Sequence, residues 1–138
     1  MCHMPSKEVI ENRSGRKIIL FLVSLALLQT LSFILIRFDL ATVNPKIFFG
    51  QYFDNETAII VVMGLLIPFW HFLKNVLKAQ VGLRNIILAS VCSNLLDRVF
   101  YGGVVDFIDL AIIPVFNAAD MVIIIGLILL CLDKTRKN

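Results

Sequence analysis

The chain has 138 residues with a net charge of only +3, and 59% of its residues are hydrophobic. A water-soluble domain is about 45–50% apolar, so this composition excludes an ordinary soluble domain and predicts a membrane protein. The length favours a single domain, 1–138. Cys2, Cys92 and Cys131 are spaced too irregularly for a disulfide framework or a zinc site, and we expect no metal and no cofactor.

Four apolar stretches follow one another along the chain, at approximately 17–36, 58–73, 81–97 and 110–132. A helix needs about 20 apolar residues to cross a bilayer, and the first and fourth stretches reach that length easily. The second stretch is short, and the third has polar residues near both ends. We predict an all-α membrane protein built as a four-transmembrane-helix bundle.

Basic residues gather on one side of these four predicted spans. The N-terminal tail, the loop after the second span and the C-terminal tail together hold ten of the 13 Lys and Arg residues. The positive-inside rule places these three segments, and therefore both termini, in the cytoplasm. Most acidic residues lie at the opposite side, which indicates that any chemistry takes place near the extracytoplasmic face of the membrane.

The segment 38–57 joins the first two predicted spans outside the cell. It contains Phe48, Phe49, Tyr52 and Phe53, and aromatic side chains prefer the membrane–water boundary. We expect a small extracytoplasmic β-like flap or hairpin that rests on the lipid. An aromatic loop with no further role fits the same residues equally well.

Asp120 is the most unusual residue of the sequence, because it opens a long apolar run, 121–132. A carboxylate within a spanning helix costs about 2.5–3.5 kcal/mol, so such a residue is by default a candidate for function. Asn117 precedes it by three residues and therefore shares its helix face. Asn94 and Asp97 share a face of the third span by the same spacing.

A second acid could reach Asp120 from the segment after the third span. Gly102 and Gly103 break the helix there, and the β-rich stretch 104–108 has Asp106 at its centre. Two carboxyls that share a low-dielectric site hold one proton between them, so one can activate water while the other donates to a carbonyl oxygen. The alternative is that Asp120 pairs with Arg98 only to neutralise a buried charge.

Three blocks in this part of the chain closely resemble the lipoprotein signal peptidase (signal peptidase II) family. They are Asn-x-x-Asp-Arg at 94–98, Val-Val-Asp-Phe at 104–107 and Phe-Asn-x-x-Asp at 116–120. The resemblance implies that Asp106 and Asp120 are the catalytic dyad. It also implies that Asn94, Arg98 and Asn117 line the site, where they hold substrate or brace the acids, and that Asp97 is a support.

A fourth family block, Asn-x-Gly-x-x-Phe, is matched only at its ends, by Asn44 and Phe49, with Lys46 in place of the glycine. The resemblance makes Asn44 a substrate-side contact from the flap. The family's Asp-Gln-x-x-Lys block of the first span is reduced to Gln29, flanked by Leu28 and Ser32. The chain thus resembles a divergent member of the family.

The resemblance implies a membrane aspartic endopeptidase that removes the signal peptide from diacylglyceryl-modified prolipoproteins, cleaving just before the lipidated cysteine. We expect it to be a multi-pass monomer of the bacterial inner membrane, in contact with prolipoproteins and lipids and not with nucleic acid. One alternative is a non-catalytic homologue that binds lipoproteins or lipids. Another is a proton or ion pathway through Asp120 and Arg98. Asp109 is interpreted as an interfacial, solvated residue.

Overall fold

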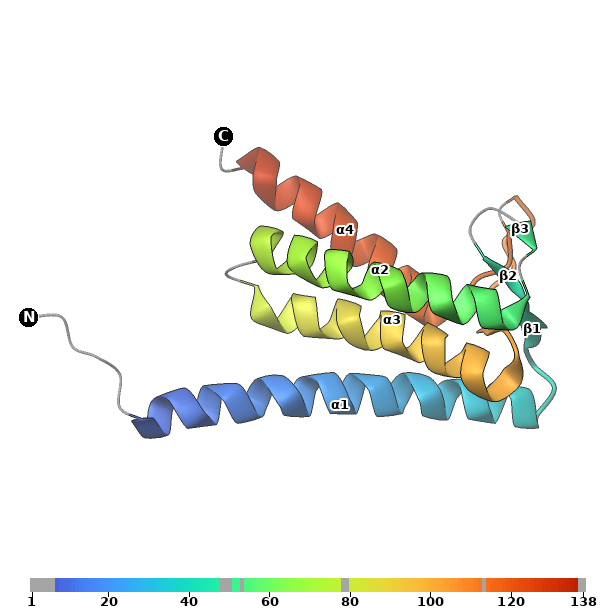
Figure 1. Ribbon diagram of the computed structural model, residues 1–138, viewed down its shortest axis with the longest axis horizontal. Coiled ribbons are helices and arrows are strands. Elements are labelled where there is room, and N and C mark those ends of the chain that lie inside the picture. The colour runs from blue at the N-terminus through green and yellow to red at the C-terminus, as the bar shows by residue number, and fades with distance from the viewer. Residues whose placement is uncertain (1–6, 48–50, 53, 78–79, 113, 137–138) are drawn as a thin grey trace, which may run out of the picture.

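The computed structural model describes residues 7–47, 51–52, 54–77, 80–112 and 114–136. Its helices lie side by side and its short strands gather at one end of them, opposite the start of the first helix and the end of the last (Figure 1). The helices are α1 (Lys7–Arg37), α2 (Asn55–Val76), α3 (Val81–Tyr101) and α4 (Ala118–Arg136). The strands are β1 (Thr42–Asn44), β2 (Lys46–Ile47), β3 (Gln51–Tyr52) and β4 (Val104–Asp106).

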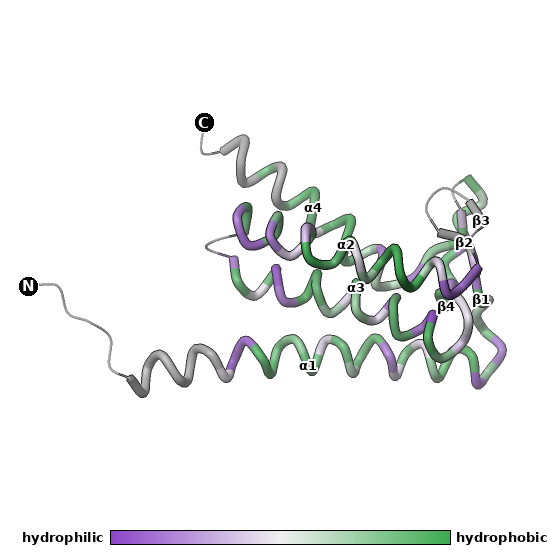
Figure 2. Tube along the Cα trace, in the orientation of Figure 1, coloured by the Kyte–Doolittle hydropathy of each residue, from purple (hydrophilic) through white to green (hydrophobic). Residues whose placement is uncertain are grey.

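The expectation of a mainly helical protein is confirmed, and two of its helices have the length and composition expected of membrane spans. Two segments, Gly15–Arg37 in α1 and Asn55–Val76 in α2, are long and apolar enough to cross a membrane, and Ala118–Leu129 is a shorter apolar helix. Apolar residues follow most of the described length of these helices (Figure 2). Many of their side chains point outward: Leu27 is 67% exposed and Ile60 is 70% exposed. Lipid would cover such surfaces.

The helix ends on the strand side are fixed by local hydrogen bonds. After α1, Asp39 adopts a left-handed conformation with φ 56°, and the Leu40 N–H donates to the Leu35 carbonyl at 2.9 Å. Before α2, the Asp54 carboxylate accepts from the Thr57 hydroxyl and from the Thr57 N–H. These bonds lower the pKa of Asp54 and satisfy an otherwise unpaired donor of the first turn.

The paired glycines end α3 and return the chain toward the bundle. Gly102 has φ 78° and its N–H donates to the Arg98 carbonyl, as in a helix C-cap. Gly103 lies against β1, because a Cβ at this position would be only 2.6 Å from the Asn44 carbonyl oxygen. The close approach lets β4 pair antiparallel with β1, with Thr42 opposite Asp106 and Asn44 opposite Val104.

Several boundaries differ from those predicted from the sequence, since α1, α2 and α3 each extend beyond the predicted span. The fourth helix, expected from residue 110, begins at Ala118, because residues 107–117 form an extended segment in which Ile108 pairs with Phe116. Pro114 lacks an N–H and Ala111 has φ 62°, so this segment cannot continue a helix. In the expected flap 38–57, β2 and β3 form an antiparallel pair, while residues 55–57 belong to α2. Phe48, Phe49 and Phe53 lie outside the described residues.

Helix α3 has an apolar half and a polar half. Away from the strands, Ile87 packs with Leu73 and Leu77 in a buried cluster, and Gly126 of α4 approaches Ile87 closely. Toward the strands, the buried residues of α3 are mostly polar: Ser90, Ser93, Asp97 and Arg98, with Ala89 among them. The polar half of α3 lies beside β4, which carries Asp106.

Candidate active site

Asp106 is the last residue of β4 and is only 4% exposed. Its two carboxyl oxygens accept from different elements: Asn44 Nδ2 of β1 donates at 2.7 Å and Asn117 Nδ2 donates at 3.2 Å. Burial raises the pKa of Asp106 to about 6, and the negative charge of Asp120 acts in the same direction. The two amide donors and the positive charge of Arg98 oppose this rise in pKa, because they favour the ionised form.

Asp120 lies in the first turn of α4 and contacts the side-chain amides of Asn94 and Asn117. Asn94 Nδ2 of α3 donates to its carboxyl at 2.8 Å, and its own N–H donates to the Asn117 side-chain oxygen at 2.8 Å. That second bond makes Asn117 the N-cap of α4. A carboxylate in the first turn of a helix is also favoured by the helix dipole.

Asn117 connects the two acids. Its oxygen caps α4 at Asp120, while its Nδ2 donates to Asp106 and also to the Asn94 side-chain oxygen at 3.1 Å. Asn94 in turn donates to Asp120. The structure therefore places Asp106 and Asp120, which come from separate elements, around one shared pair of amide side chains. We call these four residues the amide–carboxyl cluster.

Arg98 lies beside this cluster on α3 and is 5% exposed. Its Nη1 donates to the Pro45 carbonyl at 3.5 Å, and its own carbonyl accepts from Asn55 Nδ2 at 2.9 Å. These bonds join the end of α3 to the segment after β1 and to the start of α2. The arginine therefore holds the strand end of the molecule together and supplies positive charge near the two acids.

Asp97 is buried but belongs to a different group of contacts. It accepts from Gln29 Nε2 at 2.9 Å, from Ser32 Oγ at 3.2 Å and from the Val105 N–H at 3.3 Å. Asn94 shares its helix face, as the spacing predicted, yet Asn94 turns to Asp120 while Asp97 turns to α1. Asp97 thus fastens α1 and β4 to α3.

Asp109, the other acid near β4, stands apart from this cluster. It is exposed, and its carboxyl accepts from the Ala111 N–H two residues later at 2.8 Å. This local turn agrees with its interpretation as a solvated residue. Of the two acids that follow Gly103, the buried Asp106 is the one brought to Asp120.

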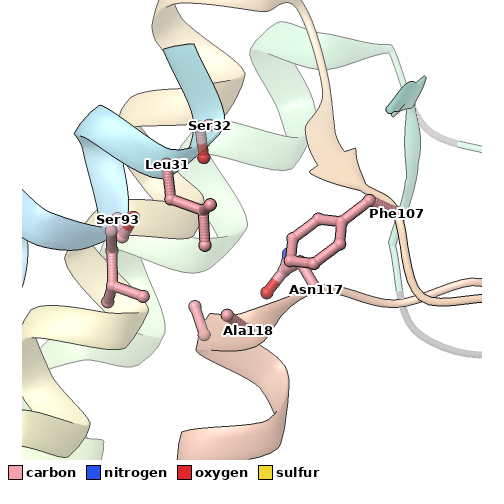
Figure 3. Close-up of a pocket in the computed structure, with 8 residues that line it drawn as sticks. Leu31, Ser32, Ser93, Phe107, Asn117 and Ala118 are labelled. Atoms are coloured by element: carbon pink, nitrogen blue, oxygen red, sulfur yellow. The ribbon is translucent and has the colours of Figure 1, made fainter. Parts of the chain in front are cut away.

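A recess of about 190 Å³, including the open space at its mouth, lies next to the cluster. Helix α1, helix α3, the segment after β4 and the start of α4 all contribute to its wall (Figure 3). The side chains labelled there are Leu31, Ser32, Ser93, Phe107, Asn117 and Ala118. The recess is mainly apolar, and Asn117 is the member that also touches both acids.

The sequence interpretation named Gln29 and Ser32 only as the remnant of a family block and missed that they reach α3. Gln29 donates to Ser93 as well as to Asp97, and Ser32 donates to Asp97. The spacing offered a sign of this contact: Gln29 and Ser32 are three residues apart, and Ser93 and Asp97 are four apart, so each pair lies on one helix face. The spacing within each helix does not indicate that these two faces pack against each other, which the structure shows.

Several relatives that carry the name lipoprotein signal peptidase are similar to this chain. The one from Syntrophomonas wolfei is 44% identical over 86 residues, which are 59% of this chain and 56% of the relative. The one from Moorella thermoacetica is 36% identical over 97 residues, or 64% of this chain and 61% of the relative. The one from Syntrophus aciditrophicus is 33% identical over 100 residues, or 68% and 60%.

The chain thus matches somewhat more than half the length of these relatives. No solved structure is significantly similar to it. The family described as "Signal peptidase (SPase) II" matches residues 20–136, a range that includes both acids, both shared asparagines and all four helices in whole or in part. This chain belongs to the signal peptidase II family.

Proposed function

We propose that this chain is a membrane aspartic endopeptidase that removes the signal peptide from diacylglyceryl-modified prolipoproteins by cleaving just before the lipidated cysteine. Asp106 and Asp120 are its catalytic dyad. The single observation that carries this proposal is the amide–carboxyl cluster, in which two acids from separate elements meet around Asn94 and Asn117. Membership of the signal peptidase II family supplies the substrate class.

The two carboxyls would share one proton, because burial and mutual repulsion disfavour two negative charges in one site. The ionised carboxyl takes a proton from a water molecule, whose oxygen attacks the scissile carbonyl carbon. The protonated carboxyl donates to the carbonyl oxygen, and the amine of the cysteine leaves with a proton when the tetrahedral intermediate collapses. The pair titrates as a unit, so neither role is assigned to one residue.

The asparagines have a defined part in this scheme. Asn44 and Asn117 donate to the two oxygens of Asp106, and Asn94 donates to Asp120. These amides fix the orientation of each carboxyl without adding a full charge that would hold both acids ionised. Asn44 comes from the loop between α1 and α2, so this loop can contact the substrate and the dyad at the same time.

We further propose that all four helices span the bacterial inner membrane, with both termini in the cytoplasm and the strands at the extracytoplasmic face. The start of α1 and the end of α4 lie at the same end of the molecule, away from the strands, which supports this topology (Figure 1). The ten basic residues on the predicted cytoplasmic side support the same orientation. The dyad then lies where a lipid anchor holds the substrate, and one chain supplies every residue of the cluster, as in a monomeric enzyme.

The dyad is tested by Asp106→Asn and Asp120→Asn in the full chain, each assayed with a diacylglyceryl-modified prolipoprotein in detergent or liposomes. Proton transfer by a positioned side chain accelerates a reaction by about 10²–10⁴-fold, so the cleavage rate of each variant should fall by at least about 10²-fold. Asp109→Asn is the matched control, because Asp109 is exposed and its carboxyl accepts from the Ala111 N–H and not from a residue of the cluster. It should cleave at the rate of the original chain.

Normal cleavage by either dyad variant would refute the assignment. If the original chain is folded and membrane-inserted but leaves the prolipoprotein uncut, the proposal of an active peptidase fails. Binding of the uncut substrate in that experiment would instead identify a non-catalytic homologue that recognises lipoproteins.

A further inference from the structure

A second polar junction lies next to the amide–carboxyl cluster, where α1 meets α3. Gln29 and Ser32 are polar residues on a strongly apolar helix, and they are three residues apart on one face. Both side chains donate to the Asp97 carboxyl, at 2.9 Å and 3.2 Å. The Gln29 amide also donates to the Ser93 carbonyl and hydroxyl, each at 3.0 Å.

Burial restricts the orientation of the Asp97 carboxyl at this junction. Asp97 is 1% exposed and Ser32 is 8% exposed, so no bulk water is available to replace a lost donor. A buried acceptor that loses its partner destabilises the folded chain, and more strongly when the acceptor is charged. The Asp97 carboxyl must therefore keep the one orientation in which its oxygens meet their donors.

That orientation extends to the strand that carries Asp106. Asp97 Oδ2 accepts both from Ser32 Oγ and from the N–H of Val105, the residue immediately before Asp106. Val105 is fully buried. The contacts run from α1 through Asp97 to the backbone of β4, and the next side chain along that backbone is a proposed catalytic acid.

We propose that Gln29 and Ser32 are positioning residues for the Asp106 carboxyl. They hold Asp97, and Asp97 holds the Val105 backbone in the place that directs Asp106 toward Asn117 and Asp120. Neither residue donates to Asp106 or Asp120 in any contact of the described chain. This inference rests on the proposed function, since it gives α1 a part in the same reaction.

The test uses Gln29→Leu and Ser32→Ala in the full chain, assayed for cleavage of a diacylglyceryl-modified prolipoprotein. Because the effect acts through the orientation of a catalytic acid, kcat should fall by about tenfold or more while KM stays within twofold. Thr30→Ala is the matched control, since Thr30 is an exposed hydroxyl residue of the same helix turn. Ser32→Thr keeps a hydroxyl donor and should restore most of the lost kcat.

Ser32 also lines the recess, which makes the division between kcat and KM decisive. A change confined to KM in Ser32→Ala would overturn the positioning role and assign Ser32 to substrate contact. Values of kcat within twofold of the original chain for both variants would overturn the proposal altogether.

Amide hydrogen exchange provides a measurement that is independent of activity. Exchange of the Val105 N–H should be at least several-fold faster in Gln29→Leu and Ser32→Ala than in the original chain or Thr30→Ala. Unchanged exchange would refute the connection from α1 to β4, even if cleavage had slowed. If the original chain cleaves nothing, the proposed function fails, whereas the exchange result still decides whether the junction holds β4.

Discussion

Asn117 uses both ends of its amide, and this double use governs what its replacement should do. Its oxygen caps α4 at Asp120, and its Nδ2 orients Asp106. We expect the first contact to contribute mainly to stability and the second mainly to the proposed catalysis. A serine at this position can still offer the capping oxygen to the helix, but it is too short to reproduce the amide donor.

We therefore expect Asn117→Ala to lose both properties and Asn117→Ser to lose one. In Asn117→Ala, the missing cap should cost about 0.5–2 kcal/mol of stability and cleavage should fall at least about tenfold. Asn117→Ser should recover most of the stability, as measured by unfolding in detergent, while cleavage remains low. Full activity in Asn117→Ser would show that the donor to Asp106 is dispensable.

The buried carboxyl of Asp106 gives stability a characteristic dependence on pH. Its pKa rises from 3.8 to about 6 on folding, because burial disfavours the ionised form. Between these two values the folded chain binds more protons than the unfolded chain, so the contribution of Asp106 to stability is present at low pH and is lost as pH rises through about 6.

The variant Asp106→Asn cannot ionise and should escape this loss. From pH 4 to pH 7, its stability relative to the original chain should improve by up to about 3 kcal/mol, following the size of the pKa change. Unfolding in detergent at several pH values measures this difference. A difference that is constant with pH, or that moves against the variant, would contradict a raised pKa for Asp106.

At the scale of elements, the contact between β1 and β4 depends on a glycine. A Cβ on Gly103 would lie 2.6 Å from the Asn44 carbonyl oxygen and 2.8 Å from a methyl group of Val43. The obstacle is largely backbone, which cannot turn aside as a flexible side chain does. An added methyl group must therefore push β1 away, and Asn44 moves with it.

Gly103→Ala should cost about 1–3 kcal/mol of stability and should lower cleavage at least about tenfold, because the Asn44 donor leaves Asp106. Gly64→Ala is the control: Gly64 lies in α2 with no atom near the position of an added Cβ. It should keep full activity and gain slightly in stability from the better helix former. Equal behaviour of the two variants would show that β1 can shift without effect on the site.

The sequence predicted where the helices lie better than it predicted where they end or which strands pair. The four apolar stretches correspond to the four helices of the described chain, because long apolar runs have few other conformations available in a membrane. The apolar residues before Ala118 gave a false start for the last helix, since extended and helical segments are equally apolar there. Pro114 was the residue that could have corrected this boundary.

The pairing of β1 with β4 was not predictable from local patterns. The two strands are separated by two helices, and each has only three residues, so no periodicity could align them. Motif resemblance selected Asp106, Asp120, Asn44, Asn94 and Asn117, which the fold then brings into contact. It marked Gln29 and Ser32 only as the remnant of a first-span block, and their contact with Asp97 arises from the packing of α1 on α3.

At the scale of the whole molecule, the two ends of α2 should lie on opposite sides of the membrane. Glu56 is exposed near the strands, and Asn75 is exposed at the far end of the same helix. In a variant without native cysteines, Glu56→Cys should react with a membrane-impermeant thiol reagent in intact cells. Asn75→Cys should react only after the membrane is permeabilised, and the reverse pattern would invert the proposed topology.

In the proposed topology, the position of the strands at one end of the helices relates the proposed dyad to the thickness of the bilayer. The apolar part of α1 has 23 residues and α2 has 22, so they are about 35 Å and 33 Å long. A typical hydrocarbon layer is about 30 Å thick. In lipids with longer acyl chains, the carboxyls would sink into hydrocarbon and lose their supply of water. In lipids with shorter chains, they would lie among the headgroups, so the host lipid would set how readily the hydrolytic water arrives.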